Sequence, residues 1–248
     1  MREKNALLIS DTAQLRDPRT RRDFLKLMGI GGAVVFLPSV ITGCNSDNNN
    51  TPTGPGTGNT VTIDFSKGDT AILQFAFALE QLEADFYTRV VNSFGSSNFS
   101  TTEKAVLLDV KYHEVIHREF LKAALGTTNG GFTLTPTYGS LNFADKTSVL
   151  ATARTFEDLG VAAYNGAAQY IASTDNLLIA GKIVSVEARH ASAIRDLINP
   201  KSSDFAPKSF DDAFRPSKVA TAAQAFIVDK LALANGPTTF VQGPNGNG

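Results

Sequence analysis

Four segments of the chain have the apolar pattern of long helices. They span residues 69–92, 100–125, 145–171 and 175–198. The first contains neither Gly nor Pro and is apolar on more than one side, which indicates a largely buried helix. The second begins with Ser100-Thr101-Thr102-Glu103, a sequence typical of a capping box, and is expected to stop at Gly126.

The connections between these segments predict two helical hairpins. Residues 126–139 are rich in Gly, Thr and Pro and cannot be helical; with the residues up to 144 they can cross the whole length of a bundle. Only residues 172–174 separate the third and fourth segments, so those helices are expected to be antiparallel neighbours. We therefore predict an all-α fold, a four-helix bundle of two hairpins joined by a long crossover. A short extra helix is expected outside the bundle at residues 216–228.

The first part of the chain has a different pattern. Residues 1–43 resemble a twin-arginine signal peptide, with Arg21-Arg22 before an apolar run that is too short and too rich in Gly for a membrane span. The run ends at Ile41-Thr42-Gly43-Cys44, which resembles a bacterial lipobox, so Cys44 is predicted to carry a lipid. These features predict twin-arginine export and a lipoprotein of the periplasm or cell envelope, anchored to a membrane through Cys44.

Composition divides the rest of the chain and excludes several partners. Residues 44–60 are expected to form a flexible tether, 61–234 the folded domain and 235–248 a disordered tail. Cys44 is the only cysteine, so the core must stabilise the fold without a disulfide. The mildly acidic domain argues against nucleic acid as a partner. Both methionines, Met1 and Met28, lie in the signal peptide, so no haem with a Met ligand is expected.

Two Glu-x-x-His pairs carry most of the chemical information. They are Glu114 with His117 in the second helical segment and Glu187 with His190 in the fourth. Helical residues three apart share a face, so each pair directs a carboxylate and an imidazole into the space between helices. Together with Glu80 and Glu157 from the other two segments, they supply four carboxylates and two imidazoles. This set is sufficient to hold two cations with bridging oxygens.

The two predicted hairpins also repeat each other. Tyr87 follows Glu80 by seven residues, and Tyr164 follows Glu157 by seven. Each tyrosine is either a hydrogen-bond donor to a ligand carboxylate or an ordinary core residue.

Glu83 is the rival of Glu80 as the ligand from the first helix. It lies one turn further along and could share the inner face. The repeat favours Glu80, because Gly160 occupies the position in the second hairpin that matches Glu83.

With these residues, the chain resembles the ferritin-like superfamily of bacterial di-metal carboxylate proteins. It is most similar in kind to exported ferritin-like domain proteins whose first helix carries Leu-Glu-x-Leu-Glu-Ala-x-Phe-Tyr, here Leu79 to Tyr87. The resemblance covers about residues 70–198 and implies a ferritin-like four-helix bundle. It also implies two terminal carboxylates, two bridging carboxylates and one imidazole for each metal: Glu80 and Glu157, Glu114 and Glu187, His117 and His190.

Two positions depart from the pattern of this superfamily. Bacterioferritin and rubrerythrin usually have Asp before the Glu of Glu-x-x-His, where it orients a ligand histidine. Here those positions hold His113 and Val186. His113 has no assigned role and is expected at an exposed surface position.

Together with the lipobox, the resemblance leads to the hypothesis of a lipid-anchored protein with two iron ions, or two manganese ions, that it oxidises with O2 or H2O2 in protection against peroxide or metal stress. The reductant must be external, because the chain has no Cys-rich electron carrier, and a homo-oligomer is compatible with the sequence. A non-enzymatic, structural envelope protein with the same metal ligands is the alternative.

A zinc metallopeptidase is a further alternative through His113-Glu114-Val115-Ile116-His117, which matches His-Glu-x-x-His. No third zinc ligand follows nearby, and the motif leaves the pair Glu187 and His190 unexplained.

Overall fold

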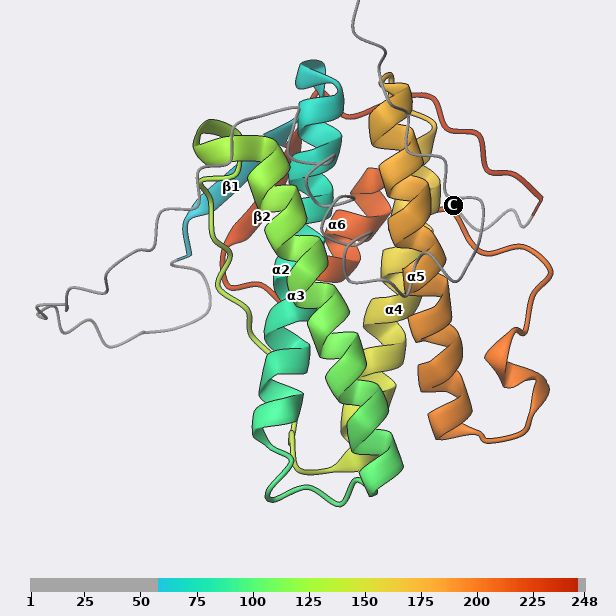
Figure 1. The fold of residues 1–248 in the computed structure, drawn as a ribbon. Coiled ribbons are helices and arrows are strands. Elements are labelled where there is room, and N and C mark those ends of the chain that lie inside the picture. The colour runs from blue at the N-terminus through green and yellow to red at the C-terminus, as the bar shows by residue number, and fades with distance from the viewer. Residues whose placement is uncertain (1–57, 245–248) are drawn as a thin grey trace, which may run out of the picture. The chain divides into compact units, whose positions relative to one another are not determined.

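The computed structural model describes residues 58–244 of the 248-residue chain. The predicted signal peptide, Cys44 and most of the predicted tether lie outside the described residues. Four long helices form the bundle in Figure 1: α2 (Asp69–Asn92), α3 (Thr101–Asn129), α4 (Lys146–Ala168) and α5 (Thr174–Ile198). A fifth helix, α6 (Pro216–Gln224), follows them. The predicted four-helix bundle with an extra C-terminal helix is confirmed.

The helices pair as two hairpins, α2 with α3 and α4 with α5. The capping box at the start of α3 is present, since the Ser100 hydroxyl accepts from the Glu103 N–H and the Glu103 carboxylate accepts from the Ser100 N–H. Gly126 interrupts the helix with φ 65°, a conformation that glycine adopts readily, and one further turn runs to Asn129. The helix end predicted at Gly126 is therefore the end of the regular part of α3.

A small parallel sheet was not anticipated by the sequence analysis. Strand β1 (Thr60–Asp64) pairs with β2 (Lys230–Ala234), with Thr60 opposite Lys230. In β1 the apolar Val61 and Ile63 alternate with polar side chains, as in a half-buried strand, whereas β2 is apolar after Lys230. The two segments stand at opposite ends of the domain sequence, so no local pattern indicates that they pair. The helix expected to reach residue 228 ends at Gln224, because the chain then turns into β2.

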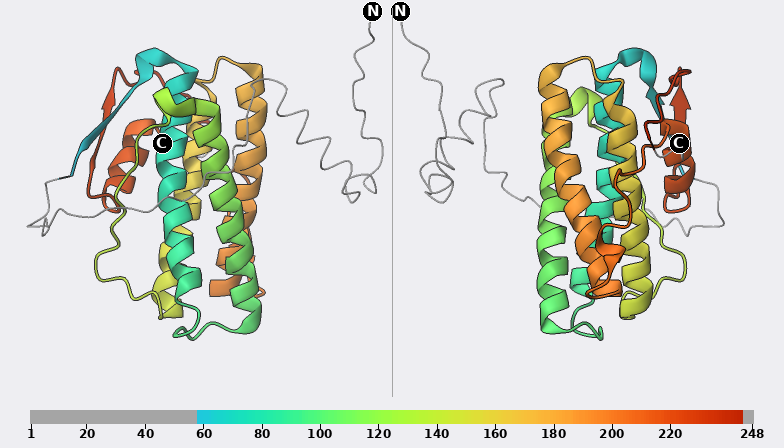
Figure 2. Two further views of the ribbon diagram at one scale, coloured as in Figure 1. Left: turned by 60° about the vertical axis from the view of Figure 1, so that its left-hand side comes forward. Right: turned by 90° about the vertical axis from the view of Figure 1, so that its right-hand side faces the viewer.

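The sheet and α6 cover the side of the bundle formed by α2 and α4, and leave α3 and α5 on the other side (Figure 2). Ile63 and Leu231 from the strands pack with Phe75 of α2 and Val219 of α6 in one core cluster. A second, largely aromatic cluster fills the bundle around Phe86. None of the helices within residues 58–244 is long and apolar enough to cross a membrane.

The predicted disordered tail is placed in part by the structure. Residues 235–244 are described, and Gln169 at the end of α4 accepts from the Val241 N–H at 2.8 Å. The Tyr170 hydroxyl donates to the Thr239 carbonyl at 2.6 Å. The Gly, Pro and Asn content of the tail predicts disorder. The local sequence does not reveal that the tail makes hydrogen bonds with Gln169 and Tyr170 at the end of α4.

Candidate metal centre

The six side chains that the sequence singles out lie together inside the bundle. Each helix contributes: Glu80 from α2, Glu114 and His117 from α3, Glu157 from α4, and Glu187 and His190 from α5. Their donor atoms form two groups, and within each group the atoms lie within 4.8 Å of one another. Glu114 and Glu187 belong to both groups. The four glutamates have no exposed surface, which is rare for a charged residue without a partner.

The contacts between these groups have an approximate two-fold relation. His117 Nδ1 lies 2.9 Å from an oxygen of Glu187, and His190 Nδ1 lies 2.8 Å from an oxygen of Glu114. Each histidine therefore faces the Glu-x-x-His carboxylate of the other hairpin. One further carboxylate is also near each ring, Glu80 at 3.6 Å from His117 and Glu157 at 3.4 Å from His190.

The two repeated tyrosines join the hairpins crosswise. The Tyr164 hydroxyl donates to Glu80 Oε1 at 2.6 Å, and the Tyr87 hydroxyl donates to Glu157 Oε1. Of the two roles considered for these tyrosines, the structure shows the hydrogen-bond donor to a carboxylate. Each tyrosine donates to the glutamate of the opposite hairpin. Each bond leaves Oε2 of Glu80 or Glu157 free to face the site.

The remaining donor atoms are buried and make no hydrogen bond among the described residues; their close contacts are the ion-pair contacts with one another given above. These atoms are Oε2 of Glu80 and Glu157, both oxygens of Glu114 and Glu187, and Nδ1 of His117 and His190. Buried polar atoms are almost always hydrogen-bonded, so eight such atoms around one position point to a group that the protein itself does not supply. Glu80 and Glu157 each have one oxygen without a hydrogen bond, as suits a ligand of a single ion. Glu114 and Glu187, which belong to both groups, each have two such oxygens, as suits a ligand that bridges two ions. These buried carboxylate and histidine clusters could hold metal ions.

The electrostatics of the site favour positive charge. Burial raises the pKa of Glu80 to about 7. Burial and the charge of Glu114 raise the pKa of Glu187 well above its usual range. Burial alone would lower the pKa of His117, but the carboxylates of Glu114, Glu187 and Glu80 raise it to about 12. The site therefore attracts cations, whether protons or metal ions.

Glu83 is a fifth buried carboxyl beside the site, and it belongs to neither donor group. Burial, followed by the charges of Glu187 and Glu114, raises its pKa well above the usual range. A Cβ atom at Gly160 would lie 3.1 Å from Glu83 Oε1, so the glycine leaves room for this carboxyl. Of the two rival glutamates of α2, only Glu80 belongs to a donor group, and Gly160, which favours Glu80 in the sequence repeat, lies beside Glu83.

His113 is a functional candidate that has no role in the two-metal site predicted from the sequence. It is exposed, as expected, yet its ring stacks on that of His190 with centroids 5.1 Å apart and 11° between the planes. His113 Nδ1 lies 2.9 Å from His190 Nε2. Because Nδ1 of His190 faces Glu114 and Glu157, its Nε2–H is the group able to donate to His113. Val186, the matching residue before Glu187, offers no such acceptor to His117.

This asymmetry gives a testable expectation. His113→Ala is expected to weaken binding of one of two metal ions by about 10–100-fold, the usual loss when a partner of a ligand histidine is removed. His113→Asn, whose side-chain oxygen can accept from His190, is expected to restore part of the affinity. Titration calorimetry with Mn²⁺ measures both sites, and Tyr112→Ala, on the same exposed side of α3, is the matched control. If His113→Ala binds both ions with the affinities of the unmodified protein, the contact orients nothing.

The fold and the site define this chain as a helical-bundle protein with a buried carboxylate and histidine cluster suited to metal ions. The family model described as ferritin-like domain matches residues 68–200, more than half of the chain, so the protein belongs to this family. A search of the curated proteins found no match.

Proposed function

We propose that the protein binds two iron or manganese ions between its hairpins and oxidises them with O2 or H2O2. The observation that carries this proposal is the set of eight buried donor atoms that make no hydrogen bond to any described residue, divided into two groups that share Glu114 and Glu187. The proposed ligands are the same six residues that the sequence singled out. Glu80 and Glu157 would be terminal ligands, and each histidine would bind one ion through Nδ1.

The four carboxylates offset the charge of two divalent ions, and they stabilise the more positive oxidised pair still further. When bound, the two ions would supply redox chemistry: one electron from each, together with two protons, would convert O2 to H2O2, or H2O2 to two waters. Tyr87 and Tyr164 would hold the terminal carboxylates in place during this change by fixing one oxygen of each. The four glutamates are fully buried, so the site is closed to bulk water.

The zinc peptidase alternative is not favoured by the geometry. His113 lies outside both donor groups and contacts His190 through its Nδ1, while His117 faces three carboxylates. In a His-Glu-x-x-His site both histidines bind the same zinc ion.

We further propose that the protein works in the periplasm or cell envelope, held by a lipid on Cys44 and supplied with electrons by an external reductant. The support is the sequence of residues 1–44, which lies outside the described part of the chain. Labelling of cells with radioactive palmitate checks the anchor, because Cys44→Ala should abolish incorporation.

The test of the proposed activity is oxidation of the loaded protein. After anaerobic loading with Fe²⁺ and analysis of metal content, the protein is mixed with O2 or H2O2 in a stopped-flow spectrometer. We expect a ferric absorbance band, with one H2O2 consumed for every two Fe²⁺ oxidised.

Bound metal with no ferric band for either oxidant would instead identify a structural metal-binding protein. A peptidase would bind one Zn²⁺ tightly and cleave casein, and would lose that activity in Glu114→Gln.

A further inference from the structure

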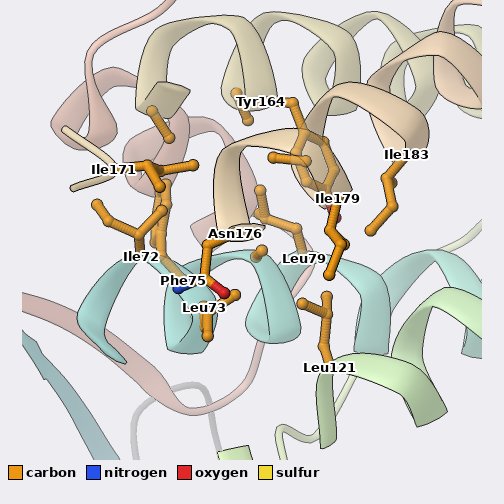
Figure 3. Close-up of a pocket in the computed structure, with 14 residues that line it drawn as sticks. Ile72, Leu73, Phe75, Leu79, Leu121, Tyr164, Ile171, Asn176, Ile179 and Ile183 are labelled. Atoms are coloured by element: carbon orange, nitrogen blue, oxygen red, sulfur yellow. The ribbon is translucent and has the colours of Figure 1, made fainter. Parts of the chain in front are cut away.

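A narrow apolar cavity lies between the two hairpins, at the end of the bundle where α2 and α5 begin (Figure 3). All four bundle helices contribute to its wall. The contributions include Phe75 and Leu79 from α2, Leu121 from α3, Tyr164 from α4, and Ile179 and Ile183 from α5. Of the 14 described residues that line it, only Tyr164 and Asn176 carry polar side-chain groups. The cavity is therefore almost wholly hydrophobic.

The cavity adjoins the candidate metal centre. Three lining residues each lie four positions, or about one helical turn, from a proposed ligand on the same helix. They are Ala76 before Glu80, Leu121 after His117, and Ile183 before Glu187. All three ligands belong to the donor group that contains His117. The cavity thus approaches one of the two metal positions and not the other.

Tyr164 stands between the cavity and that donor group. Its ring lines the cavity, and its hydroxyl donates to Glu80 Oε1 at 2.6 Å. The matching residue of the first hairpin, Tyr87, is fully buried and packs edge-on against Phe86, with ring centroids 5.0 Å apart. The two tyrosines make the same hydrogen bond, but only Tyr164 borders this cavity.

The polarity of the cavity disfavours water and hydrogen peroxide. The Tyr164 hydroxyl already donates to Glu80, and the Asn176 amide nitrogen donates to Asp69 at 2.8 Å. A trapped water needs two to four polar partners, as does a peroxide molecule of similar chemistry. A molecule without hydrogen-bonding groups loses nothing by entering.

The size of the cavity selects among apolar molecules. Its volume, counted at the centres of water-sized spheres, is about 30 Å³. One water-sized molecule needs about 10–15 Å³ by this measure, whereas cavities that hold benzene are several times larger. A diatomic gas fits without movement of the walls, and an aromatic ring or an acyl chain does not.

We infer that this cavity is the binding site through which dioxygen reaches the metal centre, on the side that holds His117 and Glu80. The inference rests on the proposed function, and it selects O2 over H2O2 as the oxidant that this route serves. Dioxygen is apolar and diatomic, so it matches both the lining and the volume. Tyr164 is then the last side chain that it passes.

Xenon provides a direct test of occupancy, because it enters apolar cavities of proteins. Crystals of the unmodified protein under xenon pressure are expected to show xenon beside Tyr164. Ala180→Phe, which adds a ring at the partly exposed mouth of the cavity, is expected to remove it. Ile179→Ala, which widens the same mouth, is expected to increase xenon occupancy. Absence of xenon from the cavity in the unmodified protein would overturn the inference.

Oxidation rates provide the second test. With metal content matched, Ala180→Phe is expected to slow oxidation by O2 by about tenfold or more and to leave oxidation by H2O2 unchanged. Ala151→Phe, the same change at an exposed position of α4 away from the cavity, is the control and should alter neither rate.

The outcomes separate this inference from the proposed function. If the unmodified protein is oxidised by neither molecule, the proposed function fails and the route fails with it. If the unmodified protein is oxidised by O2 at a rate that Ala180→Phe does not change, or if both oxidants slow equally, the route alone is wrong.

Discussion

Glu114→Ala is expected to lose both metal ions, whereas Glu80→Ala is expected to weaken mainly one. Glu114 belongs to both donor groups, and both of its oxygens are buried without a hydrogen-bond partner. Glu80 belongs to one group only, and one of its oxygens is held by Tyr164. Removing a residue that merely supports a ligand costs up to about 100-fold in affinity, so losing a shared ligand should exceed that at both sites.

Metal analysis after anaerobic loading, followed by titration calorimetry, measures this difference. Glu119→Ala is the matched control, because Glu119 is an exposed glutamate on the same helix and pairs only with its neighbour Arg118 among the described residues. It should retain two ions. A Glu114→Ala protein that keeps one ion at unchanged affinity would mean that this carboxylate serves a single metal and does not bridge.

The donor set was readable from the sequence because its information is local. A Glu and a His three residues apart share a helical face wherever the helix packs, and the four segments that carry them have a strong helical pattern. The repeat then distinguished Glu80 from Glu83 through Gly160. The structure brings these side chains to one buried position because both hairpins present the same face inward.

The contacts between side chains of different hairpins could not be predicted from the sequence in the same way. The spacing places Tyr87 on the face of Glu80, yet its hydroxyl donates to Glu157, since that choice depends on how the two hairpins pack. The contact of His113 with His190 also could not be predicted. The exposed position of His113 was expected from the helical pattern, but a partner 77 positions away in the chain cannot be inferred from that pattern.

The sheet was missed for the same physical reason. Five-residue strands are too short to be identified alone, and β1 lies where a polar tether ends. Only the register of Thr60 with Lys230 shows that these segments stabilise each other.

Metal binding is expected to raise the melting temperature of the protein strongly. A ligand at about 100 times its dissociation constant contributes about 2.7 kcal/mol of stability. For a domain of this size each kcal/mol shifts the melting temperature by about 2–4 °C, so two ions should together raise it by about 10–20 °C. Calorimetry at pH 7, with Mn²⁺ and with a chelator, measures the shift.

Two glutamine variants are expected to separate the stability gained from metal binding from the stability of the metal-free protein. Burial and the charge of Glu114 raise the pKa of Glu187, so its ionised form is costly without metal. Glu187→Gln replaces it by a neutral group of similar shape, and the metal-free protein should be at least as stable. The amide cannot bridge two cations, so most of the metal-induced rise should disappear.

Glu114→Gln should behave in the opposite way in the metal-free protein. Burial would raise the pKa of Glu114, but His117 and His190 lower it to about 2. A lowered pKa means that the ionised carboxylate contributes stability above its unfolded pKa of about 4.3, and that this contribution is lost as the pH falls towards 2. Removing the charge leaves the buried His190 without its nearest anionic partner, since Glu114 lies 2.8 Å from its Nδ1, a loss of about 3–5 kcal/mol. Calorimetry of metal-free Glu114→Gln checks this loss, and a melting temperature equal to that of the unmodified metal-free protein would contradict it.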